Sequence, residues 1–165
     1  MSRNSLLFDF TVDKALNKIY VKREFASERS LVWDAFTKKE ILDQWWAPLP
    51  WLSKTKYMDF KVGGRRFYAM VGPGGEEHWG VQDFTSITAP ENFQYMDSFA
   101  DKNEVLNADI PPAQWNLDFT ESNSKTTVSI DIQYKSLSDL EQNIEMGFKE
   151  GFTMALDHLA KLLNK

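Results

Sequence analysis

Few side chains in this sequence could act as nucleophiles, general acids or metal ligands. There is no cysteine and there are only two histidines, so thiol chemistry is excluded and a zinc site would need carboxylate ligands. Glu76, Glu77 and His78 are adjacent, but consecutive strand residues point to opposite faces of a sheet, which argues against a shared metal. We therefore predict no catalytic residue, no metal and no cofactor.

Two common motifs of catalytic sites are also missing. The stretch GPGGEE (72–77) lacks the Lys-Ser/Thr pair of a phosphate-binding loop and is typical of a hairpin turn, and there is no G-x-S-x-G sequence. His158 lies at the edge of the apolar face of a predicted C-terminal helix. Either a hydrogen-bonded structural histidine or a general base fits that position.

Asp97 is the most unusual carboxylate in the sequence. It alternates with Phe93, Tyr95 and Phe99, which places it on the apolar face of a predicted strand. A carboxylate on a buried face needs a partner or a ligand. Two alternatives remain open, namely a bulge that turns the side chain outward and an ion pair with one of the consecutive arginines at positions 65–66.

Two tryptophans stand side by side in the sequence DQWWAP (43–48). On a helical wheel, Trp45 and Trp46 lie on the same side as the apolar residues Ile41 and Leu42, and Ala47-Pro48 ends the helix. Both indoles can therefore face inward. Either both rings fill the core, or one ring lies in the core and its neighbour lies at the entrance of a cavity.

The remaining elements follow from periodicity. Strands are predicted at 8–12 and 17–26, and about six more follow in a meander between Trp51 and Lys135, so the sheet should be antiparallel with one buried face. Ser27 can cap one helix, and the capping box that runs from Thr37 to Glu40 can open a second.

A long helix is predicted from about Ser138 to Leu163. Its apolar residues form one wide face, and Gly147 and Gly151 extend that face at one edge. Each glycine costs about 1 kcal/mol in a helix interior relative to alanine. The glycines either permit close packing against a neighbouring element or leave room for a ligand beneath the helix.

Strand and helix parity together give a set of candidate ligand-binding residues around a gap between sheet and helix. They are Trp45, Trp46, Tyr68, Met70, Tyr95, Asp97, Phe99, Trp115, Phe148, Gly151 and Phe152.

Composition limits the class of protein. The 165 residues, 42% hydrophobic and 26% charged, are typical of one globular domain, residues 1–165, without a membrane span or secretory signal. A net charge of −5 argues against nucleic acid as a partner, and the lack of cysteine fits a reducing cytoplasm. We predict a cytoplasmic protein that binds neither nucleic acid nor a membrane.

Several segments together resemble a known family. They are REFASERSLVWDAFTKKEILDQWWAP (23–48), the stretch from MDFKVGG (58–64) to MDSFAD (96–101), and EGFTMALDHLAKLL (150–163). These are similar to the activator-of-heat-shock-protein-90-ATPase homology family of the START-like (SRPBCC, Bet v-type) superfamily. The resemblance implies an α+β helix-grip fold, with a curved antiparallel sheet of about 6–7 strands wrapped around a long C-terminal helix. Two short helices would follow the first strand, and an apolar cavity would lie between sheet and helix.

Three function classes follow from these observations. The first is a module that binds an apolar or aromatic small molecule in the cavity. The second, which the family name suggests, is a co-chaperone-like module that interacts with a chaperone or with itself; a chain of this length has no room for the eukaryotic co-chaperone's separate N-terminal domain, which favours the first class. The third is a cyclase-like or hydrolase-like enzyme using Asp97, His78 or Tyr68 as acid or base.

Overall fold

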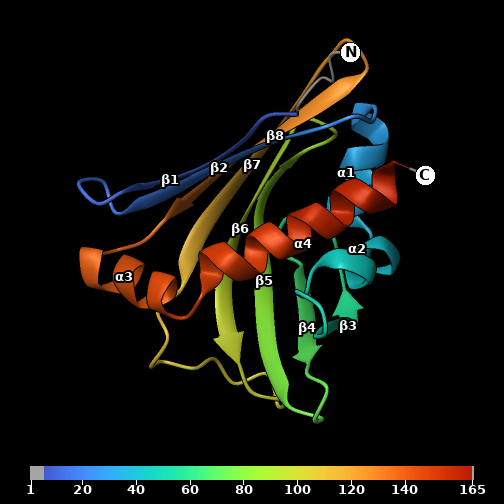
Figure 1. The fold of residues 1–165 in the computed structure, drawn as a ribbon. Helices are drawn as coiled ribbons and strands as arrows, with labels where there is room; N and C mark the ends of the chain where they lie inside the picture. The colour runs from blue at the N-terminus through green and yellow to red at the C-terminus, as the bar shows by residue number, and fades with distance from the viewer. Residues whose placement is uncertain (1–5, 165) are drawn as a thin grey trace.

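The protein is built on one antiparallel sheet in the order β1-β2-β8-β7-β6-β5-β4-β3 (Figure 1). The structure is a computed structural model and describes residues 6–164. The strands are β1 (Phe8–Asp13), β2 (Lys18–Phe25), β3 (Leu52–Met58), β4 (Arg65–Val71), β5 (Glu77–Thr88), β6 (Asn92–Ala100), β7 (Ala113–Ser122) and β8 (Lys125–Gln133). Within residues 6–164 the sheet thus has eight strands, as the periodicity predicts, where the family resemblance implied about 6–7.

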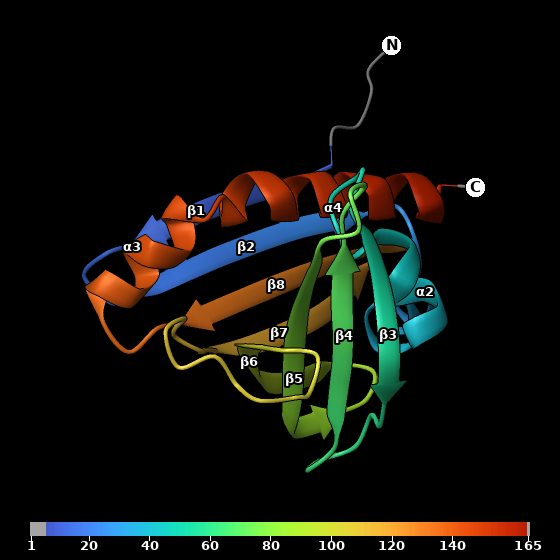
Figure 2. The ribbon, with the colours of Figure 1, turned by 90° about the horizontal axis from the view of Figure 1, so that it is seen from below.

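Four helices complete the fold of residues 6–164. They are α1 (Arg29–Thr37), α2 (Lys39–Trp45), α3 (Leu137–Glu145) and α4 (Phe148–Leu163). The sheet curves so that β3, β4 and β5 cross the direction of β2 and β8, and α4 lies along its inner side (Figure 2). The short helices α1 and α2 lie near the C-terminal end of α4, and α3 lies at its other end (Figure 1). This arrangement is the predicted helix grip, although α1 and α2 follow the second strand.

The inner face of the sheet is apolar because the strands alternate as their sequence indicates. Along β8 every second residue is buried, and Trp115 and Leu117 of β7 pair with Ile132 and Ile130 of β8. These residues form one hydrophobic core with Phe152 of α4. A single core therefore joins sheet and helix, as the sequence predicts.

The prediction of one continuous C-terminal helix is wrong. The segment is divided into α3 and α4 by Met146 and Gly147, and Gly147 has a φ of +89°. A left-handed residue cannot continue a right-handed helix, and glycine adopts this conformation without a Cβ penalty. The break lets α3 leave the axis of α4 and lie beside the end of the sheet (Figure 1).

The predicted helix caps are also wrong in detail. Thr37 belongs to α1 and its hydroxyl donates to the carbonyl of Trp33, so it does not cap α2. Lys38 occupies the cap position between the two helices, and Glu28 rather than Ser27 precedes α1. In both cases the adjacent helix makes no hydrogen bond to a capping side chain.

Across residues 6–164, every helix is too short or too polar to cross a lipid bilayer.

Candidate ligand-binding site

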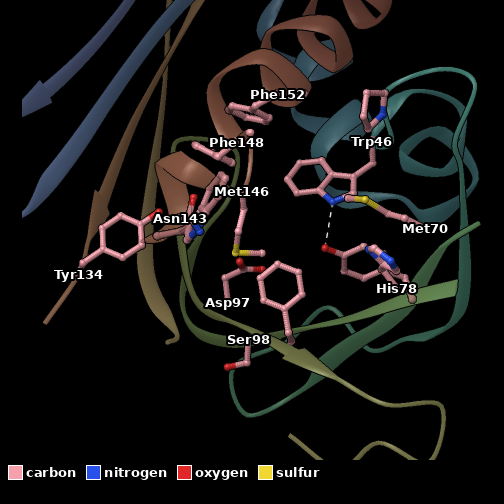
Figure 3. A pocket seen from close by; sticks show the side chains of 16 residues that line it. Trp46, Met70, His78, Asp97, Ser98, Tyr134, Asn143, Met146, Phe148 and Phe152 are labelled. Atoms are coloured by element: carbon pink, nitrogen blue, oxygen red, sulfur yellow. Dashed lines mark hydrogen bonds between the residues drawn. The ribbon is translucent and has the colours of Figure 1, made fainter. Parts of the chain in front are cut away.

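A cavity of about 220 Å³ lies between the inner face of the sheet and the junction of α3 with α4 (Figure 3). It is lined by Trp46, Pro48, Tyr68, Met70, His78, Asp97, Ser98, Phe99, Trp115, Tyr134, Asn143, Met146, Gly147, Phe148, Gly151 and Phe152. Most of these side chains are aromatic or apolar. The cavity can therefore hold the ring or chain of one small molecule.

Nine of the candidate residues line this cavity. They are Trp46, Tyr68, Met70, Asp97, Phe99, Trp115, Phe148, Gly151 and Phe152. The other two, Trp45 and Tyr95, are buried but lie outside its wall. Whether the nine bind a ligand stays a prediction.

Trp45 and Tyr95 have packing roles. The Trp45 ring is 1% exposed, packs edge-on against Phe36, and its Nε1 donates to the carbonyl of Ala35 at 2.9 Å. Tyr95 is 1% exposed and stacks on Trp115, its cross-strand neighbour, with ring centres 5.4 Å apart. Parity places Tyr95 on the correct face, but parity does not indicate which ring of a stack reaches the cavity.

One wall of the cavity is fixed by a hydrogen bond between Trp46, which follows α2, and β4. The Nε1 of Trp46 donates to the Tyr68 hydroxyl at 3.1 Å, as drawn in Figure 3. Trp46 is 7% exposed and its ring also packs against Trp115 and Phe152. Trp45 and Trp46 therefore differ in position, since only Trp46 borders the cavity.

Behind this wall lies a buried arginine. Arg66 has no exposed surface, its Nη2 and Nε donate to the hydroxyls of Ser53 and Thr55, and its Nη2 lies 3.6 Å from an oxygen of Asp43. The guanidinium also lies 4.0 Å from the centre of the Tyr68 ring, within the range of a cation–π contact. Two of its nitrogens are thus held by α2 and β3, whereas Nη1 is buried without a hydrogen-bond partner among the described residues.

Asp97 does not take either of the roles that remained open. It lies on the inner face of β6, opposite Gln82, in a regular part of the ladder, so no bulge turns it outward. Arg65 pairs with Asp83 and Glu104, and Arg66 pairs with Asp43. Within residues 6–164, no cationic group lies within 4.0 Å of the Asp97 carboxylate.

Because Asp97 has no cationic partner among the described residues, its position in the cavity wall changes the pKa of its carboxyl group. Burial raises the pKa of Asp97 from its ordinary 3.8 to about 7, and the charge of Arg66 offsets only part of the rise. Burial, together with the nearby Asp97 charge, also raises the pKa values of Tyr68 and Tyr134. Asp97 can therefore change its protonation state near neutral pH, whereas the two phenols stay protonated.

The sequence interpretation missed several lining residues. They are Pro48, His78, Ser98, Tyr134, Asn143 and Met146, together with Gly147 as a lining residue. Tyr134 could have been found, because it continues the buried parity of β8. Asn143 and Met146 could not, because they reach the cavity only through the break between α3 and α4.

The two histidines lie apart. His78 is exposed at the rim of the cavity, 5.0 Å from the ring of Trp51. His158 is half-buried on α4 away from the cavity, and its Nδ1 is buried without a hydrogen-bond partner among the described residues, which does not fit the first of its two alternatives, a hydrogen-bonded structural histidine. Neither histidine lies in contact with another imidazole, and the part of the chain described here contains no cluster of three potential metal ligands.

A curved antiparallel sheet closed over a C-terminal helix, with a cavity between them, defines a START-like helix-grip domain. Residues 26–164 match the family described as "Activator of Hsp90 ATPase homolog 1-like protein". The chain belongs to this family, as its sequence resemblance indicates.

Solved structures agree with this assignment. Protein Ms6760 from Mycobacterium smegmatis is 28% identical with a TM-score of 0.88, covering 96% of this chain and 97% of that chain. A protein from Staphylococcus epidermidis is 31% identical with a TM-score of 0.81, covering 93% of each chain. A protein from Arthrobacter aurescens is 25% identical with a TM-score of 0.90, covering 94% of this chain and 91% of that chain. No curated protein matches.

Proposed function

We propose that this protein binds a small apolar or aromatic molecule between the sheet and the α3–α4 junction. The observation that supports the proposal is the cavity of about 220 Å³ with aromatic walls. Ligand pockets for drug-sized molecules measure about 300–1,000 Å³, so the ligand should be smaller, of the size of one ring system with a short substituent.

The apolar walls alone set a modest affinity. Burying about 150–250 Å² of ring surface at about 25 cal/mol per Å² gives about 4–6 kcal/mol before the entropic cost of association. A net binding free energy of about 4 kcal/mol corresponds to a dissociation constant near 1 mM, and the entropic cost brings the net value below that figure. A purely apolar molecule should therefore bind weakly, and tighter binding requires a contact with a polar group of the cavity.

Gly151 provides the test of occupancy. A Cβ at this position would lie 3.6 Å from Pro48 Cγ, an ordinary contact, so a longer side chain fits the helix but extends toward the cavity. We expect Gly151→Leu to fold and to reduce the binding of ring probes, measured by quenching of tryptophan fluorescence. The matched control is Glu150→Leu, which adds the same side chain at the neighbouring exposed position of α4.

Native mass spectrometry of the protein purified from its own host would identify a molecule that stays bound. A mass that disappears in Gly151→Leu and persists in Glu150→Leu supports the proposal. If no probe or native molecule binds the wild-type protein, or if both leucine variants bind equally well, the proposal is wrong.

Membership of the family gives a second candidate, a co-chaperone-like interaction with a heat-shock-protein-90 ATPase. This candidate predicts that the purified protein stimulates the ATPase activity of that chaperone, and that Gly151→Leu stimulates it equally because the cavity plays no part. Lack of stimulation would exclude it.

A further inference from the structure

Asp97 is the one carboxylate among the residues that line the cavity. Asp97 is half-buried in the cavity wall, and the Met146 side chain points toward it from the α3–α4 junction (Figure 3). The aromatic residues that share the lining are Trp46, Tyr68, Phe99, Trp115, Tyr134, Phe148 and Phe152. The carboxylate therefore faces a space enclosed largely by rings.

The charges around this carboxylate do not balance. Within residues 6–164, Arg66 is the buried cation behind the cavity wall, and its Nε and Nη2 are engaged by Thr55, Ser53 and Asp43. Arg66 thus supplies one positive charge, whereas two carboxylates, those of Asp43 and Asp97, lie near it. Since Asp43 already compensates Arg66, an ionised Asp97 is a negative charge without a cationic partner in the cavity wall, and such a charge is costly.

Aromatic rings supply the second element of a cation site. A ligand cation within about 6 Å of a ring centre is attracted to the negative face of the ring, most strongly for tryptophan, and several rings around one space form a cage for ammonium groups. Here such rings surround the Asp97 carboxylate, which lines the cavity and has no ion-pair partner within residues 6–164.

We propose that the cavity selects a small organic ammonium ion, with its nitrogen beside the Asp97 carboxylate and its apolar or aromatic body against Trp46, Trp115 and Phe152. This assignment rests on the proposed ligand-binding function and specifies the chemical class of the ligand. The ligand supplies the positive charge that Arg66 does not provide. Met146 has a flexible side chain and can move aside to admit it.

The ionisable groups around Asp97 set the pH dependence of binding. They are Arg66 and Tyr68 on β4, His78 on β5, Tyr95 on β6 and Tyr134 after β8, whereas the α3–α4 junction contributes the uncharged Asn143, Met146 and Phe148. Since burial raises the pKa of Asp97 to about 7, the free protein carries a proton on this group below that pH. An ammonium ion displaces the proton, so its affinity should rise with pH up to about 8.

The test compares 2-phenylethylamine with 2-phenylethanol, which have nearly the same size but differ in charge. At pH 8 we expect the amine to bind at least ten times more tightly than the alcohol, measured by tryptophan quenching and calorimetry. Lowering the pH from 7 to 5 should weaken amine binding by at least tenfold and change alcohol binding by less than twofold. The wild-type pH profile tests the assignment without any substitution.

Asp97→Asn should remove the preference for the amine and its pH dependence. The control is Glu77→Gln, which removes one negative charge at an exposed position near the rim and retains an acceptor for Trp79 Nε1. If this control removes the preference equally, general surface charge explains the result and the assignment is wrong.

Two further outcomes separate this assignment from the function on which it rests. If the alcohol binds as tightly as the amine and Gly151→Leu blocks both, the cavity binds neutral molecules, and the ammonium assignment is overturned while the proposed function stands. If neither compound binds and no other ring probe quenches the fluorescence, both fail.

Discussion

The phenol ring of Tyr68 lies directly over Gly80 of the neighbouring strand. A Cβ at Gly80 would be 2.7 Å from Tyr68 Cζ and 2.8 Å from its hydroxyl oxygen, closer than side chains pack. Gly80 and Tyr68 are paired across β4 and β5. The absence of a side chain at Gly80 thus lets the phenol lie flat and accept the hydrogen bond from Trp46.

Gly80→Ala should therefore displace Tyr68 and break the hydrogen bond to Trp46. We expect a loss of about 1–3 kcal/mol in the free energy of unfolding, as overpacking usually costs, together with weaker ligand binding. Urea unfolding measures the loss. In the background of Tyr68→Ala the same substitution should cost clearly less, because the clash is gone; an equal cost in both backgrounds would contradict this account.

Arg66→Lys should destabilise the protein although it keeps the charge. A lysine ammonium cannot reproduce the planar guanidinium that reaches Ser53, Thr55 and Asp43 and lies against Tyr68. We expect a loss of about 2–4 kcal/mol, since the partners of a buried charge are left incompletely paired. Lys54→Arg, at an exposed position of the adjacent strand, is the control and should change stability by less than about 0.5 kcal/mol.

Asp97 should make the stability of the protein fall as pH rises. The folded state holds a proton on Asp97 up to a pKa of about 7, whereas the unfolded chain releases it near 3.8, so ionisation between these values favours unfolding. One pKa unit corresponds to about 1.4 kcal/mol, and between pH 5 and pH 8 the wild type should lose about 2–3 kcal/mol through this group. Denaturant unfolding at several pH values measures it.

Asp97→Asn should abolish that loss, whereas Asp9→Asn on the edge strand should retain it. If Asp97→Asn follows the wild-type pH profile, Asp97 does not titrate as described.

Trp45 and Trp46 should respond differently to truncation. Trp45→Ala removes a fully packed ring and should cost about 3–5 kcal/mol. Trp46→Ala should cost less, because its ring already borders empty space, but it should remove most of the ligand-dependent fluorescence change. Equal losses of stability in denaturant melts would contradict this difference between a core ring and a ring that borders the cavity.

Gly147 and Gly151 should respond to alanine with opposite signs. Gly147 has a φ of +89°, so Gly147→Ala should destabilise by about 1–2 kcal/mol. Gly151 lies inside α4 with room for a Cβ, so Gly151→Ala should stabilise by about 0.5–1 kcal/mol. Thermal melts of the two alanine variants test the break between α3 and α4. In a continuous helix, both substitutions would stabilise the protein.

Periodicity was sufficient to predict the sheet and most of the cavity wall. The alternation of 126–134 gave the buried face of β8, and the same parity placed Tyr68, Asp97 and Trp115 on the inner side. Parity specifies the face on which a side chain lies, and that information was enough for a fold in which one face is buried.

Other features depend on contacts that periodicity does not contain. Gly147 could have occupied an ordinary helical position, and only its left-handed backbone divides α3 from α4. Similarly, parity indicates that Arg66 is internal, but it does not indicate that Asp43 rather than Asp97 holds its charge. Pairings between distant segments decide which polar group remains available for a ligand.

The break at Gly147 also separates residues that are needed for folding from residues that cover the cavity. The helix α4 carries core residues such as Phe152, Leu156 and Leu159, whose replacement would compromise folding. Met146 and Asn143 cover the cavity from the preceding segment, and Met146 is 50% exposed. Substitutions at Asn143 and Met146 can therefore diversify the ligand range of related proteins, or of engineered sensors, whereas Leu140 of the same segment belongs to the core that holds the domain together.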